Sequence, residues 1–346
     1  MSLTYPPKPK PGDRVAVVSP SSGAPEIFPE VYEQGLCRLR EVYELEPVEY
    51  PTTRRMGSSP ADRARDVNAA FADPSIKAVL ASIGGDDQLT VLPYLDAELI
   101  RANPKPYFGY SDNTNLLTYL WRLGVVSYHG GSVMVHLGRG GGLHPYTRDS
   151  LRTALFDSGE VEVTAPGEST DEVIEWTTPE ALSTAAPMRP NAGWSWHHAD
   201  RVVEGVTFGG CLEILDWQLA VRRWLAPFPE YDGAVLLIET SEELPPATQV
   251  YRILRNAGEA GLLGRFDAVL VGRAVAWNID RHTSLAERES FAAEQREAVL
   301  RALAEYNPSV LAVFDVDYGH TDPQLIIPNG GRIRIDGPAR RIWLTY

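Results

Sequence analysis

The sequence predicts an α/β fold in which a doubly wound parallel sheet forms the N-terminal part and a second α/β domain follows. Short runs at 14–19 and 76–83 are apolar almost throughout, which is typical of strands buried on both faces. Segments of helical length and periodicity separate such runs. Because ligands bind beyond the carboxyl ends of the strands in these sheets, we expect a site among the polar, glycine-rich turns at 19–23, 84–87 and 110–113.

Local signals give the order of elements in the first half. Residues 59–62, Ser-Pro-Ala-Asp, combine an N-cap serine, a proline at the first helical position and an acid in the first turn. A helix therefore extends from there to about Phe71, and Asp73 and Pro74 end it. The other expected elements are a helix at 26–42, a helix that carries on from Gln88, a strand at 106–110, a helix at 113–123 and a short strand at 125–131.

The composition changes after the glycine-rich loop at 138–142, where a long stretch is rich in Pro, Thr, Glu and Trp. We interpret 140–205 as a connector or lid between an N-terminal domain at 1–139 and a C-terminal α/β domain at 206–346. The elements expected here are a helix at 146–156, a helix that opens at 209–212, strands at 234–238, 268–272 and 310–314, helices at 246–260 and 286–305, and a β-hairpin formed by 332–336 and 341–346.

Charge and cysteine content limit the function classes. The chain carries 32 basic and 46 acidic residues, a net charge of −14, so nucleic-acid binding is not expected as its main role. Its two cysteines, Cys37 and Cys211, form no disulfide framework and fit a reducing compartment. No signal-peptide core and no membrane-spanning run are recognisable, so we expect a cytoplasmic protein that binds a small molecule rather than a membrane.

The stretch 105–114, Lys-Pro-Tyr-Phe-Gly-Tyr-Ser-Asp-Asn-Thr, places Ser111 where a strand turns abruptly into a helix. Such a turn pushes the serine Oγ out at the carboxyl end of the sheet, next to the N–H groups of the helix start, as in a nucleophile elbow. The alternative is that Ser111 is only an N-cap. The pattern Gly-x-Ser-x-Asn does not decide between these, because it is not the strict Gly-x-Ser-x-Gly motif.

Two further residues with catalytic chemistry follow buried strands. Glu239 comes directly after the run 234–238, and His320 follows the run 310–314. Each alone is more typical of an ordinary loop residue. Together with Ser111 they supply a hydroxyl, an imidazole base and a carboxylate that fixes the imidazole tautomer. The backbone of the glycine pair that follows the second strand can also turn N–H groups toward an oxyanion, and each such donor contributes about 3 kcal/mol.

These motifs resemble those of the S66 serine peptidases, the family of the LD-carboxypeptidases and of the microcin C immunity proteins of the MccF type. The resemblance implies a flavodoxin-like N-terminal domain, a smaller α/β C-terminal domain, a site between them, no cofactor and a homodimer. It extends over nearly the whole chain and rests on Ser-Ile-Gly-Gly-Asp-Asp at 82–87, Gly-Tyr-Ser-Asp-Asn-Thr at 109–114, Ile-Glu-Thr-Ser-Glu-Glu at 238–243 and Gly-His-Thr-Asp-Pro at 319–323.

The resemblance also implies roles for the site residues. Ser111 is then the nucleophile, His320 the base and Glu239 the acid that orients the base. Glu242 and Glu243 stay open as alternatives for that acid. The other residues expected at the site are Gly85 and Asp112, whose N–H groups form the oxyanion hole, and Gly84 and Asp86, which bind substrate.

The long connector and the acidic run after strand 234–238 resemble the MccF-like branch, in which a connector tryptophan stacks on the adenine of an aminoacyl nucleotide. Trp194 and Trp196 are the candidates, since stacking on a base contributes about 1–3 kcal/mol; the alternative is that both only pack the loop onto the domain. Arg252 is a candidate for binding a substrate carboxylate, with a surface ion pair as the alternative. Cys211 stands where the family often has asparagine, so we expect a polar contact near the site to be missing.

The expected function is therefore hydrolysis of the amide bond in aminoacyl or peptidyl nucleotides of the microcin C type. One alternative is an LD-carboxypeptidase that removes the terminal D-alanine from a murein tetrapeptide, and another is a non-catalytic small-molecule binding protein. No metal is expected, because His197, His198 and Asp200 have no further ligand at a recognisable spacing. The loop 138–142 lacks the Gly-Lys-Ser/Thr sequence of a phosphate loop.

Overall fold

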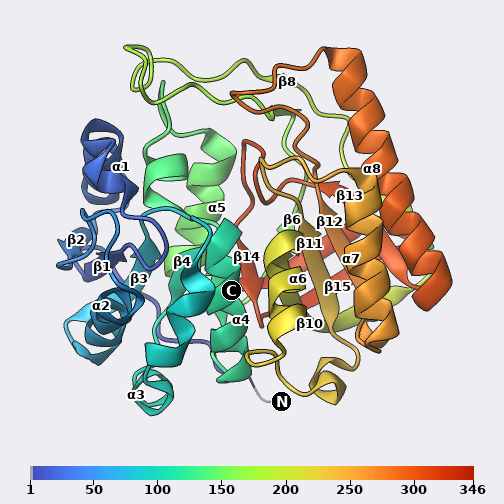
Figure 1. Ribbon diagram of the computed structural model, residues 1–346, viewed down its shortest axis with the longest axis horizontal. Helices are drawn as coiled ribbons and strands as arrows, with labels where there is room; N and C mark the ends of the chain where they lie inside the picture. The colour runs from blue at the N-terminus through green and yellow to red at the C-terminus, as the bar shows by residue number, and fades with distance from the viewer. Residues whose placement is uncertain (1–2) are drawn as a thin grey trace.

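The computed structural model describes residues 3–346, which form two neighbouring sheets with helices around them (Figure 1). The first sheet has the strand order β14-β5-β4-β3-β1-β2. Strands β1 to β5 are parallel, in the order of a doubly wound, flavodoxin-like sheet, as predicted. An antiparallel strand, β14, closes the edge beside β5. The strands are β1 (Arg14–Val18), β2 (Glu46–Glu49), β3 (Ile76–Ala81), β4 (Tyr107–Gly109), β5 (Ser127–His129) and β14 (Ile327–Asn329).

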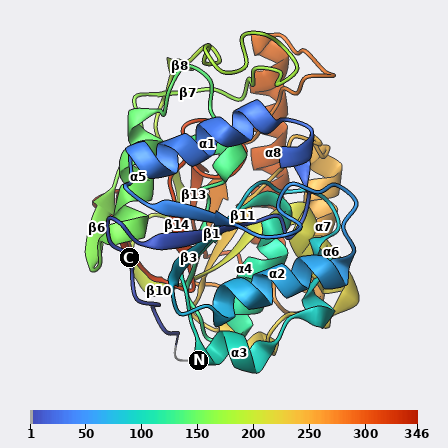
Figure 2. The same ribbon diagram turned by 90° about the vertical axis from the view of Figure 1, so that its left-hand side faces the viewer.

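Helices cover both faces of this sheet, and the alternation of side chains along β1 explains why. Val15 and Val17 pack into one core, while Ala16 and Val18 pack into the core on the opposite face. A strand that is apolar throughout is therefore buried on both sides. Figure 2 shows the sheet from its edge, with α1 above and α2 below it. The first core takes α1 (Pro29–Glu41) and α5 (Pro145–Phe156), and the second takes α2 (Pro60–Ala72), α3 (Ala97–Ala102) and α4 (Thr114–Arg122).

The second sheet has the order β6-β16-β15-β10-β11-β12-β13-β9. Its centre, from β10 to β13, is parallel, and antiparallel strands extend it on both sides. Three helices cover one face by packing on residues such as Phe208 and Val269. The strands are β6 (Glu160–Val163), β9 (Ser195–His197), β10 (Val202–Cys211), β11 (Val235–Glu239), β12 (Ala268–Gly272), β13 (Leu311–Val316), β15 (Arg332–Asp336) and β16 (Arg341–Thr345), and the helices are α6 (Leu212–Val221), α7 (Ala247–Glu259) and α8 (Leu285–Tyr306).

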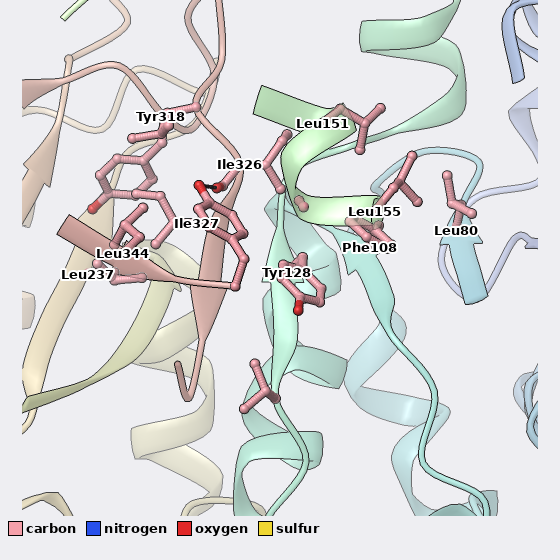
Figure 3. Close-up of a cluster of buried hydrophobic side chains, with 14 of the residues drawn as sticks. Leu80, Phe108, Tyr128, Leu151, Leu155, Leu237, Tyr318, Ile326, Ile327 and Leu344 are labelled. Carbon is pink, nitrogen blue, oxygen red and sulfur yellow. Dashed lines mark hydrogen bonds between the residues drawn. The ribbon is translucent and has the colours of Figure 1, made fainter. Parts of the chain in front are cut away.

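One apolar core joins the two sheets (Figure 3). Phe108 and Tyr128 of the first sheet and Leu151 of α5 belong to the same buried cluster as Leu237 of the second sheet. Ile327 of β14 lies between them. Because this core is continuous, residues at the carboxyl ends of β4 and β11 can contribute to one site even though they come from different sheets.

Several elements differ from the prediction. The helix expected from Gln88 consists of two short 3-10 turns, η2 (Gln88–Thr90) and η3 (Leu92–Tyr94). Pro93 explains this, because it has no N–H to continue a helix. Strands β2 and β14 and helix α3 are not in the prediction. The other short helices are η1 (Ala24–Glu26), η4 (Ser111–Asn113), the π-turn η5 (Val133–Leu137), η6 (Phe228–Tyr231) and η7 (Leu263–Arg265).

The segment 140–205 contacts both sheets. Helix α5 covers the first sheet, while β6 and β9 extend the second sheet at its two edges. Between them, β7 (Glu168–Ser169) and β8 (Arg189–Pro190) pair with each other. The division into domains at residues 139 and 205 stays a prediction. Across residues 3–346, the structure contains no helix with both the length and the apolar character needed to cross a membrane.

Candidate active site

Ser111 follows β4 by two residues, on the turn that leads into α4. Its φ is +61°, a left-handed conformation that is uncommon for residues other than glycine. Backbone strain of this kind is typical of a nucleophile elbow. Tyr110 and Asp112 on either side are buried, whereas Ser111 is partly exposed. The N-cap position of α4 is Asn113 rather than Ser111, so the turn presents the serine hydroxyl outward instead of using it as a cap.

The side chain of Asn113 ties this turn to the sheet. Its Oδ1 accepts hydrogen bonds from the hydroxyl of Tyr107 at 2.6 Å and from Nε2 of Gln88 at 2.8 Å. Its Nδ2 donates to the carbonyl of Ile83 at 3.1 Å. Four buried polar groups are thus paired with one another, which makes it costly for the turn to relax.

Asp112 makes a second set of contacts beneath Ser111. Its carboxylate accepts hydrogen bonds from the N–H of Gln88 at 2.9 Å, from Nδ2 of Asn115 at 2.8 Å and from the hydroxyl of Ser21. Burial raises the pKa of this carboxyl, and the hydrogen bonds from Ser21 and Gln88 oppose that shift. The contacts hold the peptide after the serine in a fixed orientation, as an oxyanion donor requires.

The glycine-rich turn after β3 lies directly against Ser111. A Cβ atom on Gly84 would lie 3.0 Å from the Cβ and 3.1 Å from the Oγ of Ser111. A Cβ on Gly85 would lie 2.3 Å from Oγ of Ser21. These two positions therefore need glycine for a close backbone approach. Asp86 is exposed on the same turn.

Glu239 and His320 meet at the carboxyl end of the second sheet. Glu239 is the last residue of β11 and is buried, and its Oε2 lies 2.6 Å from Nδ1 of His320 in the loop between β13 and β14. Two glycines make room for this contact. A Cβ on Gly319 would lie 2.5 Å from Oε2 of Glu239, and a Cβ on Gly272 would lie 2.6 Å from the Cβ of Glu239.

The other ring nitrogen of His320 faces the acidic loop after β11. Its Nε2 lies 3.2 Å from Oε2 of Glu242, whose side chain is 65% exposed. Glu243 is exposed, and its N–H donates to Oγ of Ser241. Burial opposes the charged form of His320, but the carboxylates of Glu239 and Glu242 outweigh it and raise the pKa of the imidazole. Burial would likewise raise the pKa of Glu239, but the nearby imidazoles outweigh it and hold that pKa low.

Ser111 and His320 lie near one another but are not hydrogen-bonded. The ring of Tyr110, the residue before Ser111, has its centroid 4.9 Å from that of His320. Within residues 3–346 the hydroxyl of Ser111 makes no hydrogen bond. The structure thus pairs the imidazole with a buried carboxylate and places the imidazole against the residue before Ser111, without a hydrogen bond to the serine hydroxyl.

The tryptophans of the connector segment are largely engaged in packing. Trp194 donates its indole N–H to Oδ2 of Asp317 at 2.9 Å, and Trp196 lies on β9 in register with Val313. Both are half-buried against the shared core. A third connector tryptophan, Trp176, is not among the sequence-based candidates and lies with its ring edge-on to Phe28 at 5.3 Å.

Other candidates have different surroundings. Arg252 lies on the exposed side of α7 and forms no ion pair with any residue in the described range 3–346. Cys211 is in register with Glu239, and its N–H donates to Oγ1 of Thr114 at 3.0 Å. The rings of His197 and His198 lie edge-on to each other, with their centroids 4.0 Å apart. Among residues 3–346, no three His, Cys, Asp or Glu side chains are grouped so that they could hold a metal ion.

Sequence reasoning missed two buried residues at the site. Arg63 of α2 forms a bidentate ion pair with Asp87 at 2.6 and 2.8 Å and donates to the carbonyl of Ser21, so it joins the first and second glycine-rich turns. His129, the last residue of β5, has its Nε2 3.6 Å from Oε1 of Glu239. The sequence did contain a signal for His129: it is a polar residue at the end of a short strand, directly before Gly130.

Chemically, the arrangement contains the parts needed for nucleophilic acyl transfer. It has an outward hydroxyl on a strained turn, backbone N–H groups next to it, and an imidazole held by a buried carboxylate.

Comparisons with known proteins agree with this chemistry. Two family models match the chain: the LD-carboxypeptidase N-terminal domain over residues 15–130 and the LD-carboxypeptidase C-terminal domain over residues 204–335, the two halves of peptidase family S66. The chain is 27% identical to the microcin C7 self-immunity protein MccF of Escherichia coli over 290 residues, 82% of this chain and 78% of that protein.

Two further similarities cover nearly the whole chain. A protein of Bacillus subtilis named "Probable murein peptide carboxypeptidase" is 26% identical over 338 residues, 96% of this chain and 91% of that protein. The structure of MccF in complex with glutamyl sulfamoyl guanosine superposes with a TM-score of 0.83 at 23% identity, covering 99% of this chain and 98% of that chain. This last similarity concerns the fold.

Proposed function

Because the chain belongs to peptidase family S66, a family of serine peptidases, we propose that Ser111, His320 and Glu239 form its catalytic triad. The observation that supports this most directly is the 2.6 Å contact between Nδ1 of His320 and the buried carboxylate of Glu239. A carboxylate at this nitrogen fixes the imidazole tautomer, so that Nε2 is free to accept a proton. Glu239, rather than Glu242 or Glu243, is therefore the orienting acid in this proposal.

In the proposed reaction, Oγ of Ser111 attacks the carbonyl carbon of an amide, and Nε2 of His320 takes the hydroxyl proton. The C–N bond then breaks, and the same proton passes to the leaving amine. Water, deprotonated by His320, attacks the acyl-enzyme and releases the acid while the proton returns to Ser111. In the unliganded site Nε2 faces Glu242, so the reaction requires the imidazole to exchange that carboxylate for Ser111 when substrate binds. Hydrogen bonds at such sites often tighten only in the substrate complex.

We assign the oxyanion hole to the backbone N–H groups of Gly85 and Asp112. The side-chain contacts of Asp112 and the close approach of Gly84 to Ser111 support this assignment, because both fix the peptides beside the hydroxyl. Losing one such donor typically costs about 3 kcal/mol of transition-state stabilisation.

For the substrate, we propose an aminoacyl or peptidyl nucleotide of the microcin C type. The similarity to the self-immunity protein MccF supports this, as does the long connector, whose Trp194 is hydrogen-bonded to Asp317, three residues before His320. The segment 140–205 would cover the bound nucleotide as a lid. Since the indole N–H of Trp194 is already bound to Asp317, only the face of its ring is available for stacking.

A murein tetrapeptide is the second candidate substrate, favoured by the similarity to the Bacillus subtilis protein. Both substrates are tested together, by incubating the wild type and S111A with an aminoacyl sulfamoyl adenosine and, separately, with a murein tetrapeptide. We expect the wild type to cleave the sulfamoyl adenosine amide and S111A to lose at least about 10³-fold in rate. Cleavage of the tetrapeptide alone would replace the proposed substrate by the second one. Binding of the nucleotide without turnover, and equally well by S111A, would indicate a binding protein and overturn the hydrolase.

A further inference from the structure

Glu239 faces a second buried histidine on the side away from His320. While Oε2 of Glu239 contacts His320, its Oε1 has no hydrogen-bond partner among residues 3–346, and neither has either ring nitrogen of His129. The Nε2 of His129 lies 3.6 Å from that Oε1, and both side chains are completely buried. An unpaired buried carboxylate oxygen and an unpaired buried N–H are each costly, so a slight approach that joins them removes both costs.

The fold aims His129 at this oxygen. His129 ends β5 in register with Gly109, which lies two residues before Ser111 on the neighbouring strand. Its ring packs edge-on against those of Tyr110 at 6.0 Å and Tyr318 at 5.3 Å. A Cβ on Gly210 would lie 2.5 Å from Oγ1 of Thr114 and 3.3 Å from Cδ2 of His129, so the glycine there makes room for both side chains.

This contact also joins the two sheets. His129 and the serine turn belong to the first sheet, whereas Glu239 belongs to the second. Of the two neighbouring strands, β4 therefore leads into the turn of Ser111, and β5 ends in His129, which faces Glu239 of the other sheet. Oε2 of Glu239 contacts His320, and its Oε1 faces the first sheet at His129.

We propose that His129, with its proton on Nε2, is a positioning residue that donates a hydrogen bond to Oε1 of Glu239 and thereby orients the carboxylate toward His320. The proposal rests on the proposed triad. It predicts that Glu239 divides its negative charge between two imidazoles. Without His129, the carboxylate rotates more freely and its full charge acts on His320.

The proposal has a specific pH signature. A stronger carboxylate interaction stabilises the imidazolium of His320, so more alkaline pH is needed before the base is neutral. The groups that face His129 are Glu239, Tyr110 and Tyr318, with His136 and His320 nearby. Burial lowers the pKa of His136 to about 3, so that side chain stays uncharged at working pH and does not produce the signature.

The test measures how fast a fluorophosphonate labels Ser111 as a function of pH, by intact mass. This needs no knowledge of the natural substrate. The serine Oγ–P bond forms, fluoride leaves, and His320 takes the hydroxyl proton. The variants are H129F, which removes both ring nitrogens, and H129Q, which keeps an N–H donor near the Nε2 position. H136N is the matched control for loss of another buried imidazole, because its amide oxygen can still accept from the N–H of Ser132, as Nδ1 of His136 does at 3.1 Å.

We expect H129F to label about 10- to 100-fold more slowly at its optimum, since small misplacement of a catalytic group has effects of this size. The acid limb of its pH–rate profile should move to higher pH. The fluorophosphonate concentration that gives half the maximal labelling rate should stay unchanged. H129Q should retain most of the labelling rate, and its acid limb should lie at the same pH as in the wild type. The acid limb of H136N should also lie at the wild-type pH. If H129F does not fold, H129L provides the same comparison.

Two results would overturn the inference while leaving the triad intact: H129F with the rate and limb of the wild type, or H129F and H129Q slowed equally with no movement of the limb. Failure of the proposed function is distinguishable, because the wild type itself would then not be labelled at Ser111.

Discussion

His320 has a carboxylate at each ring nitrogen, and the two have opposite effects on its use as a base. Glu239 at Nδ1 is buried, whereas Glu242 is exposed and lies 3.2 Å from Nε2, the nitrogen that accepts the proton of Ser111 in the proposed mechanism. Both carboxylates raise the pKa of His320. As the proposed base, His320 is active only when neutral, so we expect activity to rise as pH increases through this pKa.

We therefore expect E242Q to move the acid limb of the pH–rate profile to lower pH. Removing one negative charge destabilises the imidazolium, and the raised pKa of His320 falls. The expected movement is about 0.5 pH unit, because an exposed ion pair contributes about 0.2–1 kcal/mol and one pKa unit corresponds to about 1.4 kcal/mol.

The measurement is the rate of Ser111 labelling or of amide hydrolysis from about pH 6 to about pH 11, a range that brackets the raised pKa of His320 of about 9. E243Q is the matched control, since it removes a neighbouring exposed carboxylate that is not paired with His320 in the described part of the chain. Equal movement by both variants would indicate a general effect of net charge instead of the contact with Nε2.

At the scale of single residues, the turn that carries Ser111 was predictable from the sequence, but the contacts among the residues around it were not. Ser111 stands at a local change of periodicity, which the sequence displays directly. The approach of His129 to Glu239 joins residues from two sheets and depends on strand register, for which neighbouring residues carry no signal. The sequence also does not distinguish the roles of Glu239 and Glu242, because both lie at the end of the same strand or just after it. Only the structure shows which ring nitrogen of His320 each one faces.

Among the elements, the connector is held by α5, β6 and β9, and one buried carboxylate adds a side-chain anchor near its end. Asp317 accepts hydrogen bonds from Nε1 of Trp194 at 2.9 Å and from Nδ2 of Asn191 at 2.8 Å. Arg273 lies 3.2 Å from the same carboxylate and donates to Oδ1 of Asn191 at 2.7 Å. Burial raises the pKa of Asp317, but Arg273 and these donors oppose that shift. The anchor lies three residues before His320, so it attaches the connector to the loop that carries His320.

We expect D317N to loosen the connector. The amide cannot balance the charge of Arg273, and one of its atoms is a donor facing other donors, so stability should fall by about 2 kcal/mol or more. Limited proteolysis should then cut within 140–205 faster than in the wild type, and the melting temperature should fall. W194F, which loses only the indole hydrogen bond, should show a smaller effect. Cleavage at the wild-type rate in D317N would contradict this anchoring role.

Elements with a strong local pattern were predicted well. The apolar strands β1, β3, β11 and β13 and the capped helix α2 all lie close to their expected positions, because burial on both faces and capping are local properties. Strand β14, Ile-Pro-Asn, has neither alternation nor length and forms only because β5 offers it an edge. The turns η2 and η3 replace an expected helix because Pro93 has no N–H to continue it, and Gln88 is hydrogen-bonded to Asp112, Asn113 and Leu116.

For the molecule as a whole, the shared apolar core determines how the two sheets respond to damage. Leu151 of α5 is fully buried in the cluster that contains both Phe108 and Leu237. Loss of packing there removes contacts from both sheets together.

L151A should therefore destabilise the protein by about 2–5 kcal/mol, the usual cost of emptying a buried leucine site. Because the core is continuous, calorimetry should show one transition that moves to lower temperature as a unit. V221A, at a position that is 47% exposed, should change stability by less than about 0.5 kcal/mol. Two separate transitions, of which L151A moves only one, would show that the sheets unfold independently.

The position of β14 has a consequence for how this protein is made. A ribosome delivers β1 to β5 early, yet the strand that closes their outer edge is encoded at 327–329. Until then the β5 edge keeps its backbone groups unpaired, and the nascent first half is open to pairing with other chains. For the same reason, a hybrid that combines the first half of one relative with the second half of another needs a β14 strand that still pairs with β5.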